Sequence, residues 1–525
     1  MKRVVQVAAA IFLLAGCINS SIEIPEKGIS QALANKRVAI LDSVCYNLHF
    51  SIPDSLTDSV KGEAEITFQL KERPQSLVLD FTSPDSSSLK VVNVGKEINP
   101  EVVVCNGHIV IPKRYLNKGE NRMRLSFTSD SRTLNRNRDF LYTLNVPNKA
   151  SKVFPCFDQP NIKATFTLNL SIPIRWNAVS NGSIASDSIA NGKRNIAFHP
   201  SQKISTYLFA FAAGKFDKAE ETTNGMPVAI YYIQTDSLKV KKNMDAIYNQ
   251  VAQSLKFMEE YTSIKYPFEK YDLVLIPSFQ FGGMEHPGAT YYKASKLLLD
   301  ENPSLQDEMS RTNLIAHETA HMWFGDLVTM SWFNDVWLKE VFAGLFAEKI
   351  TNPQYPEIDH NLLFMLSNYP RALSVDRTAG THPIAQELEN QDNAASLYGS
   401  IIYNKAPIAM RLLERKMGEE PFKQALREYL SHYSYGNATW ADLLTMFQRQ
   451  VKEDLGGWNQ DWINGNGVPE IEILIKKDDR AAIIAKNDGV ANAQAFEINL
   501  LDSNSSNRIE FKALPGKIMT KSLSS

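Results

Sequence analysis

The sequence lacks a strong charge of either sign, a low-complexity tract, and any long apolar run beyond its first residues. Lysine and arginine number 56 against 58 acidic residues, and a net charge of −2 provides no basic field for nucleic acid. Away from the N-terminus no segment approaches the length of a membrane-spanning helix. What remains is a globular composition, 44% hydrophobic and 22% charged, in 525 residues. Such a chain is too long for one hydrophobic core, so we expect about three domains.

Cysteine is scarce as well. Besides Cys17, the chain has Cys45, Cys105 and Cys156, an odd number that cannot pair completely. In an oxidising compartment one pair could form a disulfide, but buried free thiols are the favoured interpretation. The three cysteines lack the spacing of a metal site.

The N-terminus has the pattern of a secretory signal. Two basic residues precede an apolar run that is too short to span a membrane comfortably. It ends in Leu-Ala-Gly-Cys, residues 14–17, which resembles a bacterial lipobox, in which the cysteine is lipidated and becomes the first mature residue. We therefore predict a lipoprotein signal peptide over residues 1–16 and a lipid anchor on Cys17. Secretion with a chance cysteine is the alternative.

This anchor would hold the protein in a bacterial cell envelope. The residue after Cys17 is Ile18 rather than aspartate, which by analogy with enteric bacteria favours the outer membrane, on its periplasmic or surface face. The polar stretch that follows is predicted to tether the folded body to the lipid over residues 17–36.

Residues 37–218 have the alternating pattern of half-buried strands. Runs such as GEAEITFQL, RMRLSF and ATFTLNLSIP place an apolar residue at every second position. Antiparallel strands with one buried face require this alternation. We predict an all-β N-terminal domain over these residues.

The period then changes to that of helices. In KKNMDAIYNQVAQSLKFMEEY, apolar residues recur on one face of an amphipathic helix. A strand is predicted at 271–277, helical patterns dominate 305–455, and Thr439 is the expected N-cap of the clearest late helix. We predict a mixed α/β to α catalytic domain over 219–458 and a short, partial β domain over 459–525.

Histidine is rare, nine in all, yet two stand four residues apart in HETAH. Residues four apart lie on the same face of a helix, so His317 and His321 can offer two nitrogens to one ion. Zinc accepts nitrogen and oxygen ligands, and a catalytic zinc keeps one position open for water. Glu318 follows a ligand directly and is placed to act as general base. The alternative is a helix with two satisfied polar histidines.

Such a site requires a third protein ligand. Glu340 lies on the next predicted helix, which Asn334 or Asp335 could cap, and that helix can return antiparallel to the first. The predicted centre is one zinc ion held by two imidazoles and one carboxylate.

The segment HETAHMWFGDLVTMSWFNDVWLKEVFA resembles the zinc motif of the aminopeptidase N and leukotriene hydrolase family, which are gluzincin metallopeptidases. The family pattern is H-E-x-x-H, eighteen residues, then a glutamate within W-L-N-E-G-F-A, and the same interval occurs here. The resemblance implies that His317, His321 and Glu340 are the ligands and that Glu318 is the base.

Two departures from the family pattern flank the third ligand. Lys339 replaces the usual asparagine and Val341 replaces the usual glycine. Neither removes a ligand, but both would alter the hydrogen bonding and packing around Glu340.

A second motif underlies the expectation of exopeptidase activity. A carboxylate holds a free α-ammonium most strongly where water is scarce. FGGMEHPG, just after the predicted strand, resembles the family's G-x-M-E-N motif and carries that glutamate as Glu285. Its glycines would let a substrate pair like an added strand. The predicted substrate-binding residues are Phe281, Gly282, Gly283, Met284 and Glu285.

Three points about this motif stay open. Phe281 is interpreted either as an aromatic floor for the first substrate side chain or as core packing. His286 stands where asparagine is commonest and receives no role. Without the resemblance, the whole stretch would be interpreted as a glycine-rich turn with a solvated glutamate.

Tyr403, in LYGSIIYNKAP, matches a family tyrosine of a Y-x-K-G setting whose hydroxyl donates to the developing oxyanion, although Ala406 replaces the glycine. Donors of this kind stabilise a transition state by about 2 or 3 kcal/mol. Tyr398 resembles a supporting family feature. From the residues alone, both tyrosines would be assigned to packing.

FPCFDQPNIKATF resembles the signature that ends the family's β domain, with Asp158 expected to order a turn. About twelve residues earlier, relatives carry a glutamine or glutamate that also touches the substrate amine. Val146 stands at that position, next to Asn145. The resemblance therefore predicts a weaker hold on the substrate N-terminus.

Together these motifs imply a multidomain α+β protein with an all-β N-terminal domain, a thermolysin-like catalytic domain and a short C-terminal β module. The implied activity is a zinc-dependent aminopeptidase that acts on peptides with a free N-terminus. The alternatives are a catalytically inactive peptide-binding lipoprotein of the same fold, or a related epoxide hydrolase or endopeptidase. Relatives continue into a long helical domain, whereas here about sixty residues follow Trp462.

Overall fold

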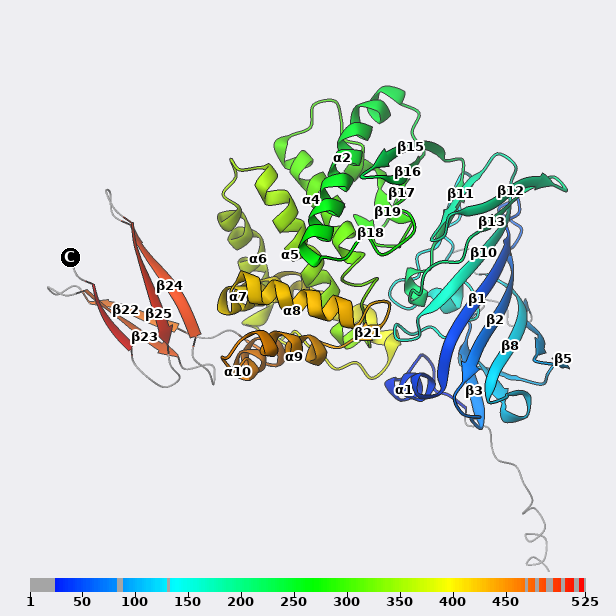
Figure 1. Ribbon diagram of the computed structural model, residues 1–525, viewed down its shortest axis with the longest axis horizontal. Coiled ribbons are helices and arrows are strands. Elements are labelled where there is room, and N and C mark those ends of the chain that lie inside the picture. The colour runs from blue at the N-terminus through cyan, green and yellow to red at the C-terminus, as the bar shows by residue number, and fades with distance from the viewer. Residues whose placement is uncertain are drawn as a thin grey trace, which may run out of the picture.

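The computed structural model describes residues 24–82, 88–129 and 133–467, and it describes the backbone of five further strands up to residue 523 (Figure 1). A β-rich part comes first in the chain and a largely helical part follows it, as the sequence predicts. The predicted signal peptide over residues 1–16 and Cys17 lie outside the described residues.

The largest sheet of the described chain has the strand order β12-β13-β10-β1-β2-β8-β4-β5. Its members are β1 (Leu41–Ser51), β2 (Lys61–Leu70), β4 (Lys90–Val94), β5 (Glu97–Ile98), β8 (Gly119–Thr128), β10 (Ala164–Ile172), β12 (Ile184–Ala190) and β13 (Lys193–Phe198). The alternation that predicted these strands is confirmed, because alternate residues of β2, β8 and β10 are buried. One pairing differs from the antiparallel expectation: β1 and β10 run parallel.

Two smaller sheets complete the β-rich part. One consists of β3 (Ser76–Asp80), β6 (Val103–Cys105) and β7 (His108–Pro112). The other consists of β9 (Phe140–Tyr142), β11 (Asn177–Ser180) and β14 (Phe211–Gly214). Cys45, Cys105 and Cys156 are all free, as favoured from their odd number. Only Cys156 is buried, so the expected burial does not hold for the other two.

The tether prediction is wrong over its last residues. Helix α1 (Gln31–Ile40) begins inside the stretch assigned to the tether, and the Ser30 side chain accepts a hydrogen bond from the Leu33 amide at its start. Ala34 and Arg37 of this helix are buried. The stretch belongs to the folded body because Arg37 forms a buried ion pair with Asp80.

The helical part is built around a sheet of its own, in the order β15-β16-β17-β19-β18. Its strands are β15 (Asp217–Thr223), β16 (Met226–Tyr232), β17 (Leu273–Ile276), β18 (Gly283–Met284) and β19 (Thr290–Lys293). The strand predicted at 271–277 is confirmed as β17. Strand β18, which carries part of the glycine motif, lies at the edge of this sheet.

Helices pack on this sheet and beside it (Figure 1). They are α2 (Ser237–Thr262), α3 (Ala294–Leu297), α4 (Leu305–His321), α5 (Trp337–Thr351), α6 (His360–Asp376), α7 (Ala406–Met417), α8 (Glu419–His432), α9 (Trp440–Gln450) and α10 (Gly456–Asn459). Two predictions are confirmed here: the amphipathic helix is α2, and Thr439 caps α9 by accepting from the Asp442 amide. None of the described helices combines the length and apolarity needed to cross a membrane.

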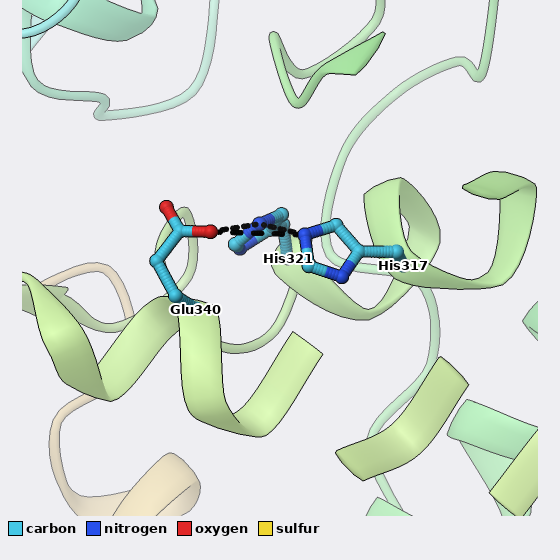
Figure 2. Close-up of side chains that lie close together, drawn as sticks. All are labelled: His317, His321 and Glu340. Carbon is cyan, nitrogen blue, oxygen red and sulfur yellow. Dashed lines mark hydrogen bonds and ion pairs between the residues drawn. The ribbon is translucent and has the colours of Figure 1, made fainter. Parts of the chain in front are cut away.

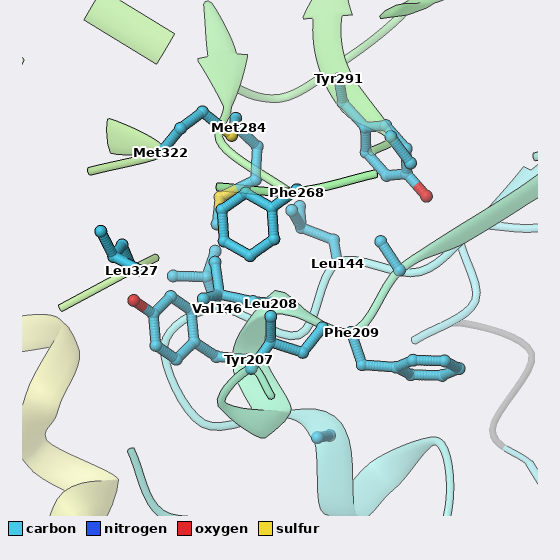
Figure 3. Close-up of a cluster of buried hydrophobic side chains, with 14 of the residues drawn as sticks. Leu144, Val146, Tyr207, Leu208, Phe209, Phe268, Met284, Tyr291, Met322 and Leu327 are labelled. Atoms are coloured by element: carbon cyan, nitrogen blue, oxygen red, sulfur yellow. The ribbon is translucent and has the colours of Figure 1, made fainter. Parts of the chain in front are cut away.

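One hydrophobic core continues from the β-rich part into the helical part. Figure 3 shows the contact region, where Leu144, Val146 and Leu208 of the first part meet Met284 and Met322 of the second. All of these side chains are buried. The loops that surround the candidate site are therefore held by packing from both parts.

The strands at the C-terminal end form a separate module in Figure 1. They are β22 (Ile471–Lys476), β23 (Ala481–Asn487) and β26 (Met519–Leu523), which share a sheet, and the hairpin β24 (Gln494–Leu501) and β25 (Ser506–Ala513). Helical structure extends to residue 464 through a π-helical turn (Gln460–Asn464), so these strands begin later than residue 459.

Candidate metal centre and its cavity

Two helices bring the predicted metal ligands together. Helix α4 begins at a capping box of Ser304 and Asp307 and ends at His321, so that His317 and His321 lie on its last turn. Glu340 comes from the first turn of α5 and points toward the two imidazole rings (Figure 2). The side chains that the sequence separates by up to 23 positions thus meet at one point.

The spacing of the three side chains fits a metal ion. The two Nε2 atoms of His317 and His321 are 3.1 Å apart, and Glu340 Oε2 lies 3.7 Å and 3.9 Å from them. Ligand atoms about 2.1 Å from one tetrahedral zinc are about 3.4 Å from each other. His321 Nδ1 donates to the Phe324 carbonyl oxygen at 3.1 Å, which leaves its Nε2 with the free lone pair that a metal requires.

A second set of side chains near the same point, Glu285, Glu318 and His321, is also close enough to share an ion. In this set Glu285 already accepts a hydrogen bond from Lys339, and only one of the three side chains is an imidazole. The two-imidazole, one-carboxylate set is therefore the better zinc site.

The start of α5 differs from the sequence prediction. Asn334 and Asp335 belong to a 3-10 turn (Phe333–Asp335), and the residue before the helix, Val336, makes no side-chain cap. The Asp335 carboxylate instead accepts from the Trp440 amide at 3.1 Å. The predicted cap is wrong because this carboxylate binds the start of α9, a partner far away in the sequence.

Glu318, the predicted base, is buried beside the ligands at 4% exposure. Burial first, and then the charges of Glu285 and Glu340, raise the pKa of Glu318 well above its ordinary value. A side chain in place of Gly283 would collide with the Glu318 carboxylate and force it to move. A carboxylate with a raised pKa is suited to take up and return a proton near neutral pH.

Glu285, the predicted amine anchor, is engaged by a residue that the sequence interpretation did not assign to it. Lys339 Nζ lies 2.5 Å from Glu285 Oε1 and 3.0 Å from Glu340 Oε1. Burial alone would raise the pKa of Glu285, but the charge and hydrogen bond of Lys339 lower it to about 2. Burial opposes the charge of Lys339 too, yet the two carboxylates raise the pKa of its ammonium. One feature of the sequence marks Lys339 as unusual, its replacement of the usual asparagine, and nothing in the sequence connects this lysine to Glu285.

One cavity of about 880 Å³ contains all of these groups. The predicted site residues that line it are Phe281, Gly282, Gly283, Met284, Glu285, His317, Glu318, His321, Glu340 and Tyr403. Phe281 is 45% exposed, so its side chain faces the cavity rather than the core. Val146, which stands where the resemblance implies a polar side chain, also lines the cavity.

The two candidate tyrosines lie next to each other on the cavity wall. Tyr403 belongs to a π-helical turn (Ile401–Lys405), and its ring stacks on that of Tyr398 with centroids 6.2 Å apart. Tyr403 is 46% exposed, whereas the Tyr398 hydroxyl is buried and has no hydrogen-bond partner in the described chain. Tyr403 therefore presents the accessible hydroxyl of the pair.

Two further residues of the motifs, His286 and Asp158, are buried. His286 is fully buried, packs edge-on against Tyr291, and has neither ring nitrogen bonded within the described residues. Burial lowers the pKa of His286 to about 3, so the ring is neutral. The Asp158 carboxylate accepts from the Ser151 amide and the Thr206 hydroxyl, so it connects segments distant in the chain, and its expected role in ordering a turn stays a prediction.

A partly buried triad that fits zinc, with a buried carboxylate beside it in one cavity, is the arrangement of a metal-dependent hydrolase site. Two family profiles match the chain: "Peptidase M1 N-terminal domain" over residues 42–208 and "Peptidase family M1 domain" over residues 247–462. The protein belongs to the M1 peptidase family, the aminopeptidase N family that its motifs resemble.

Curated relatives carry aminopeptidase names. The chain is 31% identical over 326 residues to "Probable aminopeptidase 2" of Sulfurisphaera tokodaii, covering 62% of this chain and 41% of that one. It is 31% identical over 380 residues to "Puromycin-sensitive aminopeptidase" of Caenorhabditis elegans, covering 71% and 39%. It is 30% identical over 443 residues to "Aminopeptidase M1-D" of rice, Oryza sativa subsp. japonica, covering 81% and 50%. The chain thus spans half or less of the length of these relatives.

Proposed function

We propose that the protein is a zinc-dependent aminopeptidase that removes N-terminal residues from peptides. The observation that carries this proposal is the meeting of His317, His321 and Glu340 at ligand spacing, with Glu318 beside them in one cavity. Membership of the M1 family and the names of the relatives support the same activity.

The residues divide the chemistry among them. A zinc ion held by the triad would supply a Lewis acid and lower the pKa of a water molecule from about 15.7 toward 7. Glu318 takes the proton from the attacking water and gives it to the departing amine. Tyr403, whose side chain faces the cavity, donates a hydrogen bond to the oxyanion that develops on the peptide carbonyl.

Substrate positioning is assigned to the glycine motif. Strand β18 is the edge strand of its sheet, so a peptide backbone can pair beside Gly283 and Met284. Glu285 follows directly and faces the cavity, where it marks the position of the substrate's amino end. Phe281 contributes an aromatic surface for the first side chain.

The test combines a metal assay with a panel of amino-acid arylamides. We expect about one zinc per chain, hydrolysis of at least one arylamide, loss of hydrolysis with a chelator and recovery when zinc is returned. Copper, manganese and magnesium added in place of zinc serve as controls for the identity of the ion. Undiminished hydrolysis after complete metal removal would contradict the proposal.

We further propose that Cys17 anchors the protein to a bacterial membrane by its lipid. The support is the signal-like N-terminus and the lipobox-like residues 14–17. Expression in a bacterial host with radiolabelled palmitate should label the protein, and Cys17→Ser should abolish the label and move the protein to the soluble fraction. Equal labelling of both proteins would refute the anchor.

A further inference from the structure

The cavity has an ammonium of its own at the position assigned to the substrate amine. The Lys339 side chain reaches from the first turn of α5 to Glu285 Oε1 at 2.5 Å. Its second contact, at 3.0 Å, is Glu340 Oε1, the carboxylate oxygen that does not face the two imidazoles. The three side chains are 4% to 8% exposed, so this is a buried network and not a surface pair.

This ammonium contacts two carboxylates and an aromatic ring of the protein. The Tyr207 ring lies 5.7 Å from Lys339 Nζ and adds a cation–π contact. In the described part of the chain, Lys339 is the side chain that donates a hydrogen bond to Glu285. Because the lysine is attached to the chain and already desolvated, it needs no entropy of association to stay there, whereas a substrate ammonium must lose its water first.

We propose that Lys339 is a specificity-determining residue, which neutralises Glu285 so that hydrolysis does not require a charged amino end on the peptide. The inference rests on the proposed peptidase function and concerns its substrate class. Peptides with an uncharged amino end, such as N-acylated peptides, are accepted within about tenfold of peptides with a free α-ammonium. A second cation beside Lys339 would meet like-charge repulsion in a site with little water.

The neighbouring wall of the cavity agrees with an uncharged end. Val146 and Pro147 line the cavity together with Glu285. Val146 provides no acceptor for an ammonium, and it belongs to the apolar cluster that includes Met284 (Figure 3). An acyl group would find apolar surface here, and its carbonyl oxygen could accept from Lys339.

The decisive comparison uses the unaltered protein loaded with zinc. The best arylamide of the panel and its N-acetyl derivative are compared by kcat/KM. We expect the acetylated substrate to reach at least one tenth of the value of the free amine. A larger preference for the free amine would overturn the inference.

Variants test whether Lys339 causes this tolerance. Lys339→Met should raise the preference for the free amine by on the order of tenfold, because Glu285 then lacks its internal cation. Lys339→Arg keeps the charge and is the matched control, which should keep the ratio near that of the unaltered protein. An unchanged ratio in a folded Lys339→Met would overturn the assignment, and if this variant does not fold, the comparison on the unaltered protein decides.

A binding measurement separates this inference from the proposed function. Calorimetry on zinc-loaded Glu318→Gln, in which turnover is expected to be lost, compares leucine amide with N-acetyl-leucine amide. Binding of the acetylated amide within tenfold of the free amide supports the inference even if neither arylamide is hydrolysed, in which case only the proposed activity fails. Tighter binding of the free amide by more than tenfold overturns the inference whatever the activity.

Discussion

At the scale of single residues, Glu318 carries the most direct prediction. Glu318→Gln keeps the shape of the side chain but removes the group that takes the water proton. We expect the variant to bind zinc as the unaltered protein does and to lose about 10²- to 10⁴-fold in kcat. Metal content and steady-state kinetics measured on the same preparation provide the check. Activity within tenfold of the original would exclude Glu318 as the base.

The adjacent tyrosines allow a matched pair of variants. Tyr403→Phe removes the accessible hydroxyl and should lower kcat by about 10²-fold, since one oxyanion donor is lost. Tyr398→Phe removes a buried hydroxyl without a hydrogen-bond partner in the described chain, so it should leave the unfolding free energy unchanged or raised. Kinetics and urea unfolding of both variants test this division. A larger loss of kcat in Tyr398→Phe would reverse the assignment.

The residues of the site differed in how far the sequence could reveal them. The candidate ligands could be predicted because helical periodicity places His317 and His321 on one face, and the family spacing points to Glu340. The contact between Lys339 and Glu285 could not be predicted, because it depends on how α5 lies against the loop that follows β18. The sequence showed only that the residue before Glu340 is unusual.

At the scale of elements, local patterns predicted those strands and helices whose contacts are local. The predictions failed where an element is held by residues distant in the sequence. The alternating burial of β2 and the Thr439 cap of α9 involve neighbours within a few residues. The sequence pattern assigns residues 31–36 of helix α1 to the tether because the partners that hold this helix, Asp80 and Gln159, come much later in the chain. Nothing in the local pattern of residues 31–40 indicates that Arg37 is buried.

The attachment of α1 predicts a pH dependence of stability. His108 Nδ1 and Arg37 both contact the buried Asp80 carboxylate, at 2.8 Å and 2.5 Å. Burial would raise the pKa of Asp80, but the charge of Arg37 and the His108 hydrogen bond lower it. Burial would lower the pKa of His108, but its hydrogen bond to Asp80 and the charge of Asp80 raise it.

The two shifts act on opposite sides of a pH window. The contribution of Asp80 is present above its unfolded pKa of about 3.9 and is lost as the pH falls through the lower folded value. The contribution of His108 is present below about 6.5 and is lost as the pH rises through the higher folded value. The cluster thus stabilises most between about pH 4 and 6.5, and His108→Gln should flatten the decline above that window in urea unfolding. An unchanged alkaline decline would contradict this account.

Asp80 itself is the larger structural test. Asp80→Asn leaves the buried Arg37 guanidinium without its counter-charge, and breaking a buried pair in this way costs about 3–5 kcal/mol. We expect a loss of that size in the free energy of unfolding, with zinc binding retained in the folded fraction. Glu101→Gln, at an exposed pair with Arg114, is the matched control and should change stability by less than about 1 kcal/mol.

At the scale of the whole molecule, length suggested separate domains, but the structure joins two of them through one core. Apolar side chains of the β-rich part and the helical part pack together in Figure 3. The partly buried Lys163 ammonium adds a polar link, donating to the carbonyl oxygens of Asp326 and Leu327 in the loop after α4. This shared packing holds that loop, and His321 before it, against the β-rich part.

The shared core predicts that the two parts unfold together. Leu208 is fully buried in the contact region, and Leu208→Ala should cost about 2–5 kcal/mol for the cavity that it leaves. If the parts are one cooperative unit, the variant lowers the unfolding midpoint of the helical signal and of the zinc-dependent activity by equal amounts. Circular dichroism and residual activity over the same urea series measure both.

Leu426→Ala, on α8 away from this contact region, is the control for a general loss of stability. If Leu208→Ala loses activity at a urea concentration where its helices are still intact, the two parts are in contact but do not unfold as one cooperative unit.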